Sequence, residues 1–257
     1  MNPSSGDFPK TIKIGILVFD DFEPIDVWGV IQAFSIARFI GTDYGTVTPV
    51  PFEIALIANQ DSCAKDDSLP LVKSYNGPRV AADYFRNDAL HCDFDMLMIP
   101  GGQGTRPILE SLDKSVNAEP LQCDDELKAL LDWVKLMNKK VSIMASVCTG
   151  AAILACTGLL DGKPAATNHH SFAWVTSFGP KVLWNNVSRW VDDGHYVTSA
   201  GVSAGTDLAF HLVSRLAGRA VAETAALAAE YDWHRDPNQP IFYPQQASVP
   251  SSLPSKK

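Results

Sequence analysis

A short apolar run that ends in a cysteine constrains the fold of this 257-residue chain more than any other feature. Val141–Val147 is mostly apolar, as is typical of a buried parallel strand, and Cys148 follows it directly. The small residues from Gly150 onward favour a helix that begins at once. The sequence therefore predicts that Cys148 lies on a strand-to-helix turn at the carboxyl edge of a sheet.

This position gives Cys148 two possible roles. A thiol at a helix start lies near the partial positive charge of the helix dipole, so we expect an exposed nucleophile with a lowered pKa. The alternative is a small buried hydrophobe, which is the usual role of a free cysteine. The stretch alone does not decide between them.

Composition excludes several classes of protein. A formal net charge of −8 disfavours nucleic acid and anionic membranes as partners, because both require a basic surface, and favours a small-molecule substrate. The N-terminus lacks a secretory signal, and no stretch approaches the ~18 consecutive apolar residues of a membrane span. We therefore expect a cytoplasmic protein.

The cysteines indicate neither a disulfide framework nor a metal site. Their number is odd and their spacing matches neither a disulfide framework nor a zinc site. We expect reduced thiols, no metal and no other cofactor. The five cysteines are Cys63, Cys92, Cys123, Cys148 and Cys156.

The first part of the chain predicts a strand, a turn with carboxylates and a helix. Thr11–Phe19 is β-branched and apolar, Asp20–Pro24 is a turn, and Ile25–Arg38 has helical spacing. Phe52–Ala58 is predicted as a second strand. Residues 70–92 are ambiguous and suggest short strands around a turn at 76–78.

A second apolar strand, Phe94–Ile99, leads into Pro100-Gly-Gly-Gln-Gly104. Glycine has no Cβ, so the backbone N–H groups of Gly101 and Gly102 are expected to point freely into a cleft. A plain tight turn is at least as good an explanation of these glycines.

The remaining elements continue the alternation of helices and strands. Helices are predicted at 124–138, 150–157, 206–216 and after Gly218 to about 230, strands at 165–168, 182–191 and 195–199, and a glycine-bearing loop at 201–205. Asp207 is expected to be a structural acid that faces its helix dipole.

This alternation predicts one α/β domain with a doubly wound, mostly parallel, flavodoxin-like sheet and helices on both faces. The domain is expected to span residues 11–233, between a flexible tail at 1–10 and a Pro/Ser-rich arm at 234–257. If the three relevant strands are neighbours, the turns at 20–26, 101–104 and 148–149 meet in one cleft.

These residues resemble the ThiJ/PfpI superfamily, the cysteine branch of the class I glutamine-amidotransferase-like fold, over about residues 12–232. The motifs that carry the resemblance are Asp21-Phe-Glu23, Ile99-Pro-Gly-Gly102, Ala145-Ser-Val-Cys-Thr-Gly150, Gly158-Leu-Leu-Asp-Gly-Lys163 and Ala200-Gly-Val-Ser-Ala-Gly-Thr-Asp207. Cys-Thr-Gly with Leu-Leu-Asp-Gly-Lys is most similar to the isonitrile hydratase subgroup. AraC-type regulators share these features, but too little chain follows residue 232 for a helix-turn-helix domain, so we expect no regulator.

The resemblance implies a site. Cys148 is similar to the family nucleophile, and Gly102, with Gly101 beside it and the N–H groups of Cys148 and Thr149, resembles the anion-stabilising site. Two acids stand at candidate positions for the proton-handling partner. Glu23 matches the protease-like and glyoxalase-like members, whereas Asp26 matches the isonitrile hydratases and is preferred.

One position departs from the subgroup pattern. Asn168 stands where the subgroup has histidine, and His169 and His170 follow it. A histidine beside the cysteine would suggest a Cys–His pair and a substrate-binding role for His169. Surface histidines at a helix start are the alternative.

The leading hypothesis is a cofactor-independent lyase in which Cys148 attacks an isonitrile and an N-substituted formamide is released. A glyoxalase III-like α-oxoaldehyde lyase and a non-catalytic, redox-sensing or stress-protective protein are alternatives. Amide hydrolysis ranks lower, because no complete Cys–His–acid triad is evident. The resemblance also implies a homodimer.

Overall fold

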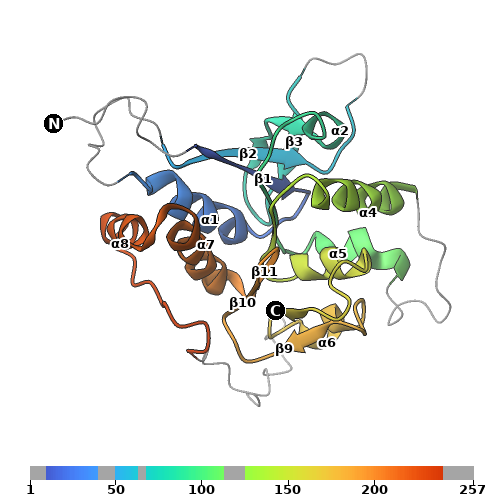
Figure 1. Ribbon diagram of the computed structural model, residues 1–257. Coiled ribbons are helices and arrows are strands. Elements are labelled where there is room, and N and C mark those ends of the chain that lie inside the picture. The colour runs from blue at the N-terminus through green and yellow to red at the C-terminus, as the bar shows by residue number, and fades with distance from the viewer. Residues whose placement is uncertain (1–9, 40–49, 63–67, 113–124, 240–257) are drawn as a thin grey trace, which may run out of the picture.

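Seven strands form the central sheet, in the order β10-β11-β7-β6-β1-β2-β5 (Figure 1). All neighbouring strands are parallel except β10 and β11. The strands are β1 (Ile12–Val18), β2 (Phe52–Ala58), β5 (Tyr84–Phe85), β6 (Met96–Ile99), β7 (Ile143–Ser146), β10 (Trp190–Asp193) and β11 (Tyr196–Ser199). The prediction of a mostly parallel α/β sheet is confirmed.

The computed structural model describes residues 10–39, 50–62, 68–112 and 125–239. The expected tail at 1–10, except for Lys10, lies outside these ranges. So do Cys63, Cys123 and the arm beyond residue 239. None of the three described cysteines forms a disulfide bond.

Helices cover both faces of the sheet (Figure 1). α1 (Pro24–Ile36), α7 (Val202–Ala217) and α8 (Arg219–Ala228) lie on one face, and α4 (Asp125–Asn138) and α5 (Gly150–Cys156) on the other. In the described part of the chain, no helix is both long enough and apolar enough to cross a membrane.

Short elements complete the structure. β3 and β4 form an antiparallel hairpin around residues 74–78, and β8 pairs with β9 in a small parallel sheet. These elements are β3 (Leu71–Lys73), β4 (Arg79–Ala81), α2 (Arg86–Ala89), α3 (Thr105–Leu109), the 3-10 turn η1 (Glu110–Leu112), β8 (Pro164–Ala166), α6 (Phe172–Thr176) and β9 (Leu183–Asn185).

Burial explains why the central strands are predictable from sequence. Every residue of β6 and β7 is buried, because helices cover both faces of the sheet. β2 has the predicted bounds, and α5 is followed by Gly158 in the left-handed region, with φ of 77°, as expected of a helix end.

Two local predictions are wrong. The expected loop at 201–205 is helical from Val202, and Gly205 serves packing, since a Cβ there would lie 2.5 Å from the Val147 side chain. The expected strand at 182–191 is divided into β9 and β10. The Asn185 carboxamide accepts hydrogen bonds from the N–H groups of Val187 and Ser188, which turns the chain between them.

Candidate active site

The turns after β1, β6 and β7 meet at one edge of the sheet because these three strands are neighbours. Phe22 forms an isolated bridge with Gly102, and the Glu23 N–H donates to Gly101 O at 2.9 Å. These contacts bring together the carboxylate-bearing turn, the glycine turn and the Cys148 turn. The sequence predicted this arrangement for the case in which the three strands are neighbours.

Cys148 lies on the turn between β7 and α5 in the left-handed region, with φ of 56°. This conformation costs about 1–2 kcal/mol for a residue with a side chain, so the surroundings must hold it in place. The Cys148 N–H donates to Ala200 O at 2.9 Å, and Thr167 Oγ1 donates to Cys148 O at 2.9 Å. Both backbone groups of the cysteine are thus anchored to other segments.

Gly101 brings the carboxylate-bearing helix to the cysteine. A Cβ at Gly101 would lie 2.5 Å from Thr149 N and 2.9 Å from Cys148 Cβ, so only glycine permits this approach. The Gly101 N–H donates to Asp26 Oδ2 at 2.8 Å. Asp26 is fully buried, and within the described residues its Oδ1 has no hydrogen-bond partner.

Burial raises the pKa of Asp26 to about 7. The hydrogen bond from Gly101 opposes this shift, the nearby Glu23 carboxylate adds to it, and a hydrogen bond with the Cys148 thiol opposes it. A carboxylate with a pKa near neutrality can accept a proton at physiological pH and release it again.

The pKa of Cys148 is raised, not lowered as the sequence suggested. Burial is the largest cause and the Asp26 carboxylate the second, whereas Thr149 and Asn168 lower the pKa through hydrogen bonds. The residue is only 7% exposed, so loss of hydration outweighs the start of a helix that has just seven residues. At neutral pH the sulfur keeps its proton beside Asp26.

The expected open set of backbone donors is smaller than predicted. Gly101 N–H is bonded to Asp26, Gly102 N–H donates to Thr149 Oγ1 at 3.1 Å, and Cys148 N–H is bonded to Ala200. The Thr149 N–H is the backbone donor that acts on the Cys148 sulfur. The glycine turn therefore holds the acid and the threonine in place rather than offering free amides to a ligand.

Asn168 is a side chain of the candidate site to which sequence reasoning assigned no role. Its carboxamide lowers the pKa of Cys148 through a hydrogen bond. Its Oδ1 accepts the Ser171 N–H at 2.9 Å, which leaves the amide NH₂ as the donor for the sulfur. The sequence signal for Asn168 was its position, because the isonitrile hydratase subgroup has a histidine there.

Two other candidates act less directly. Glu23 is half-buried and influences Asp26, but it is not among the groups that shift the pKa of Cys148. His169 is also absent from those groups. Burial lowers the pKa of His169, and its Nε2 is buried with no hydrogen-bond partner among the described residues.

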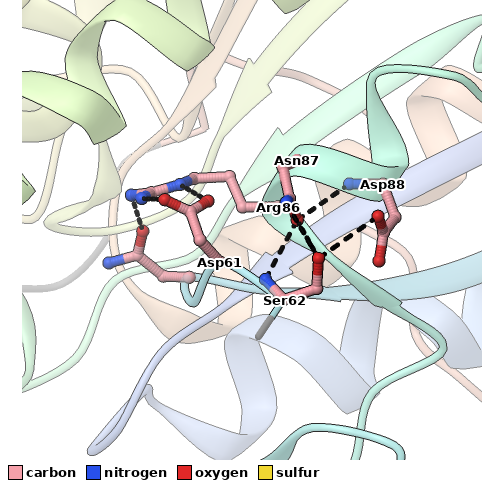
Figure 2. Close-up of polar contacts among 6 residues, drawn as sticks. Asp61, Ser62, Arg86, Asn87 and Asp88 are labelled. Atoms are coloured by element: carbon pink, nitrogen blue, oxygen red, sulfur yellow. Dashed lines mark hydrogen bonds and ion pairs between the residues drawn. The ribbon is translucent and has the colours of Figure 1, made fainter. Parts of the chain in front are cut away.

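A second polar cluster lies at the carboxyl end of β2 (Figure 2). Arg86 Nε and Nη2 donate to the two carboxylate oxygens of Asp61 at 3.1 and 2.7 Å, and Nη1 donates to Asn59 Oδ1 at 2.9 Å. These residues line a cavity of about 670 Å³. Since each guanidinium nitrogen is paired, the cluster is organised as a structural network. No group of three or more potential metal-ligating side chains is found among the described residues.

Together, the parallel sheet and the left-handed cysteine define a class of α/β proteins with a sharp strand-to-helix elbow at the carboxyl edge of the sheet. The sequence pattern of the DJ-1/PfpI family matches residues 12–215, and the chain belongs to that family.

Named relatives differ in function. The chain is 29% identical over 137 residues to isonitrile hydratase of Pseudomonas putida, and the aligned region covers 53% of this chain and 52% of the hydratase. It is 28% identical over 157 residues to the HTH-type transcriptional regulator CdhR of Pseudomonas aeruginosa, covering 54% and 43%. The chain thus spans about half the length of these curated relatives.

Solved structures agree on the fold. A ThiJ/PfpI family protein from Pseudomonas syringae has a TM-score of 0.66 and 25% identity, covering 90% of this chain and 81% of that one. Oxidized DJ-1 of Toxoplasma gondii has a TM-score of 0.62 and 20% identity, covering 87% and 100%.

Proposed function

We propose that this protein is a cofactor-independent hydratase that converts isonitriles into N-substituted formamides, with Cys148 as nucleophile and Asp26 as the group that moves the proton. The single observation behind the proposal is the Asp26 carboxylate, which is fully buried, has one oxygen without a hydrogen-bond partner among the described residues, and acts on the buried thiol. Similarity to an isonitrile hydratase supports the choice of substrate.

The first step forms a thioimidate. Asp26 accepts the thiol proton as the Cys148 sulfur attacks the terminal carbon of the isonitrile, and the same proton is then delivered to that carbon. A carboxylate with a pKa of about 7 suits both halves of this transfer, because it accepts and donates at similar cost near neutral pH. The product is a thioimidate, in which the former isonitrile carbon has a new C–S bond and a new C–H bond.

The second step is hydrolysis. Water adds to the thioimidate carbon, and one of its protons goes to the imine nitrogen. The C–S bond then breaks as the C=O bond of the formamide forms, and the second water proton goes to the sulfur. In this proposal Asp26 accepts a proton from the attacking water and returns one to the sulfur. One isonitrile and one water are consumed for each formamide.

Access to the sulfur supports a slender electrophile. Cys148 and Thr149 are each only 7% exposed, so little of the thiol meets solvent. The linear N≡C group of an isonitrile presents its reactive carbon at its tip, with no substituent beside it. An amide or ester carbonyl has substituents on both sides of its reactive carbon and is harder for so buried a thiol to reach.

The test is turnover of a panel of alkyl and aryl isonitriles, followed by formamide production. Cys148→Ala is expected to abolish turnover. Cys156→Ala is a matched control, because Cys156-Thr157-Gly158 repeats the local sequence of Cys148-Thr149-Gly150 at a helix end. The parent rate should rise with pH through about 7 as Asp26 loses its proton.

Other outcomes would redirect the proposal. Consumption of methylglyoxal without isonitrile turnover would indicate an α-oxoaldehyde lyase. Failure to consume either substrate, with selective oxidation of Cys148 by dilute hydrogen peroxide, would indicate a redox-sensing role. The expected homodimer stays a prediction, which light scattering can test.

A further inference from the structure

A buried ion pair lies behind the Cys148 site. Asp207, in the second turn of α7, is fully buried, and its Oδ2 accepts hydrogen bonds from Arg189 Nε at 3.0 Å and from Arg189 Nη2. The Arg189 side chain is only 7% exposed. A charge pair this deeply buried is costly unless further hydrogen bonds satisfy it.

Those further bonds come from the segment Tyr231–Asn238. Tyr231 Oη donates to Asp207 Oδ1 at 3.0 Å, the His234 N–H donates to the same oxygen at 3.1 Å, and Trp233 Nε1 donates to Asp207 O at 3.1 Å. The Tyr231 ring stacks on Phe210 of α7 with ring centroids 5.2 Å apart. The segment is thereby attached to α7 by polar and aromatic contacts.

The same segment also holds the backbone of Arg189. The Arg189 N–H donates to Pro237 O at 2.7 Å, and Ser188 Oγ donates to Asn238 Oδ1 at 3.0 Å. Arg189 is therefore restrained through its side chain by Asp207 and through its main chain by Pro237.

Two consecutive hydrogen bonds connect Arg189 to the nucleophile. The Ala200 N–H donates to Arg189 O at 2.8 Å, and the Cys148 N–H donates to Ala200 O at 2.9 Å. The second bond is one of the two that anchor the left-handed backbone of Cys148. A displacement of Arg189 would be transmitted to that anchor.

We propose that the Arg189–Asp207 pair, clamped by Tyr231–Asn238, positions the backbone of Cys148 so that its thiol faces Asp26 and Asn168. An unfavourable left-handed conformation persists only when its surroundings over-determine it, and this chain of contacts supplies that restraint from outside the site. Arg189 and Asp207 are positioning residues, since neither acts on the sulfur. The inference requires a reactive thiol but no particular substrate.

The test compares two buried arginines. Arg189→Met breaks the pair connected to Cys148. Arg86→Met breaks the cluster of Figure 2, in which the Arg86 side chain donates to Asp61 and Asn59 and, among the described residues, to no group of the Cys148 turn. For each folded variant, the rate of Cys148 alkylation by iodoacetamide is measured from pH 5 to 10 by mass spectrometry. The parent is expected to show an inflection near pH 7 that reflects proton transfer to Asp26.

Arg189→Met is expected to lose this inflection and to react about tenfold more slowly at pH 7, because small displacements of a reacting group have large effects on rate. Arg86→Met should keep the parent profile within about twofold, in line with its separation from the site. Tyr231→Phe keeps the aromatic stack and removes one donor to Asp207, so it should shift the profile in the same direction by less.

The proposal is wrong if folded Arg189→Met retains the parent profile, or if Arg86→Met loses the inflection to the same extent. If Arg189→Met does not fold, Tyr231→Phe decides, and an unchanged profile in that variant also overturns the proposal. Because alkylation needs no isonitrile, these results are independent of whether the proposed hydratase activity is found.

Discussion

Asp26 and Asp207 are both fully buried, but their carboxylates are satisfied to very different degrees. Asp207 accepts hydrogen bonds at both oxygens, from Arg189, Tyr231 and the His234 backbone. Asp26 accepts one backbone N–H at Oδ2, and its Oδ1 has no partner among the described residues.

This difference separates a positioning acid from a reactive one. A buried carboxylate that is paired with a cation and satisfied by several donors is suited to holding its surroundings in place. A buried carboxylate with no cation beside it and with a neighbouring acid binds a proton more readily. The pKa of Asp26 rises to about 7, because burial and Glu23 outweigh the hydrogen bonds from Gly101 and the Cys148 thiol. This incomplete satisfaction next to Cys148 is what suits Asp26 to the proposed chemistry.

The largest expected effect comes from removing the reactive acid. Asp26→Asn keeps the shape of the side chain and the Gly101 hydrogen bond but cannot accept the thiol proton. We expect kcat to fall by about 10²- to 10⁴-fold, the usual contribution of a general acid–base group. Steady-state kinetics on an isonitrile measures this, and a variant within a factor of three of the parent would contradict the role of Asp26.

The same substitution should change how stability depends on pH. The pKa of Asp26 rises from 3.8 in the unfolded chain to about 7 in the fold, so between these values the folded state holds a proton that the unfolded state has released. Parent stability therefore declines as pH rises through this window, by up to roughly 4 kcal/mol at about 1.4 kcal/mol per pH unit.

Asp26→Asn has no such proton to lose. Its stability relative to the parent should be greatest near pH 8 and should diminish toward pH 4. Urea unfolding at several pH values measures the difference, and a constant difference across the range would show that Asp26 does not titrate in this window.

Removing the charge of Asp207, by contrast, should destabilise the fold. Asp207→Asn leaves the Arg189 charge buried without its counter-ion, so we expect a loss of about 3–5 kcal/mol in the free energy of unfolding at pH 7. Glu223→Gln is the control, because its ion pair with Arg219 is exposed, and its urea midpoint should not change. Equal midpoints for the two variants would remove the distinction between Asp207 and a surface acid.

A smaller effect is expected from one donor to Asp207. Burial and the Asp207 carboxylate raise the pKa of Tyr231, so its phenol keeps its proton and donates at all physiological pH values. Tyr231→Phe should lower the free energy of unfolding by about 1 kcal/mol, the usual net value of one hydrogen bond. An unchanged urea midpoint would mean that the remaining donors satisfy Asp207 fully.

Much of the fold could be predicted because its signals are local. β2 has the predicted bounds, and β1, β6 and β7 lie within the apolar runs that indicated them, since buried parallel strands show as continuous apolar stretches. The helical start at Val202 was missed because glycine usually weakens a helix, whereas Gly205 here allows α7 to pack closely against Val147 in the cysteine segment.

The sequence predicted which residues make up the candidate site better than it predicted their pKa shifts. The residues Cys148, Asp26 and Gly101 lie together because β7, β6 and β1 are adjacent in the sheet. The sequence was compatible with this strand order but did not specify it. The predicted direction of the Cys148 pKa shift was wrong. A helix start can be read from the local sequence, whereas burial, the largest cause of the shift, depends on the tertiary structure. Asp207 was expected to face a helix dipole, but its partner Arg189 comes from the segment before β10.

The sequence by itself determined where a strand ends in a cysteine and where acids and glycines follow other strands, because the backbone preferences of neighbouring residues specify such turns. Only the tertiary structure decided that Asp26 is short of hydrogen-bond partners, that Asn168 contacts the sulfur, and that Asp207 is satisfied through Arg189. Burial and pairing depend on contacts between distant segments, and burial is the largest cause of the raised pKa of both Asp26 and Cys148.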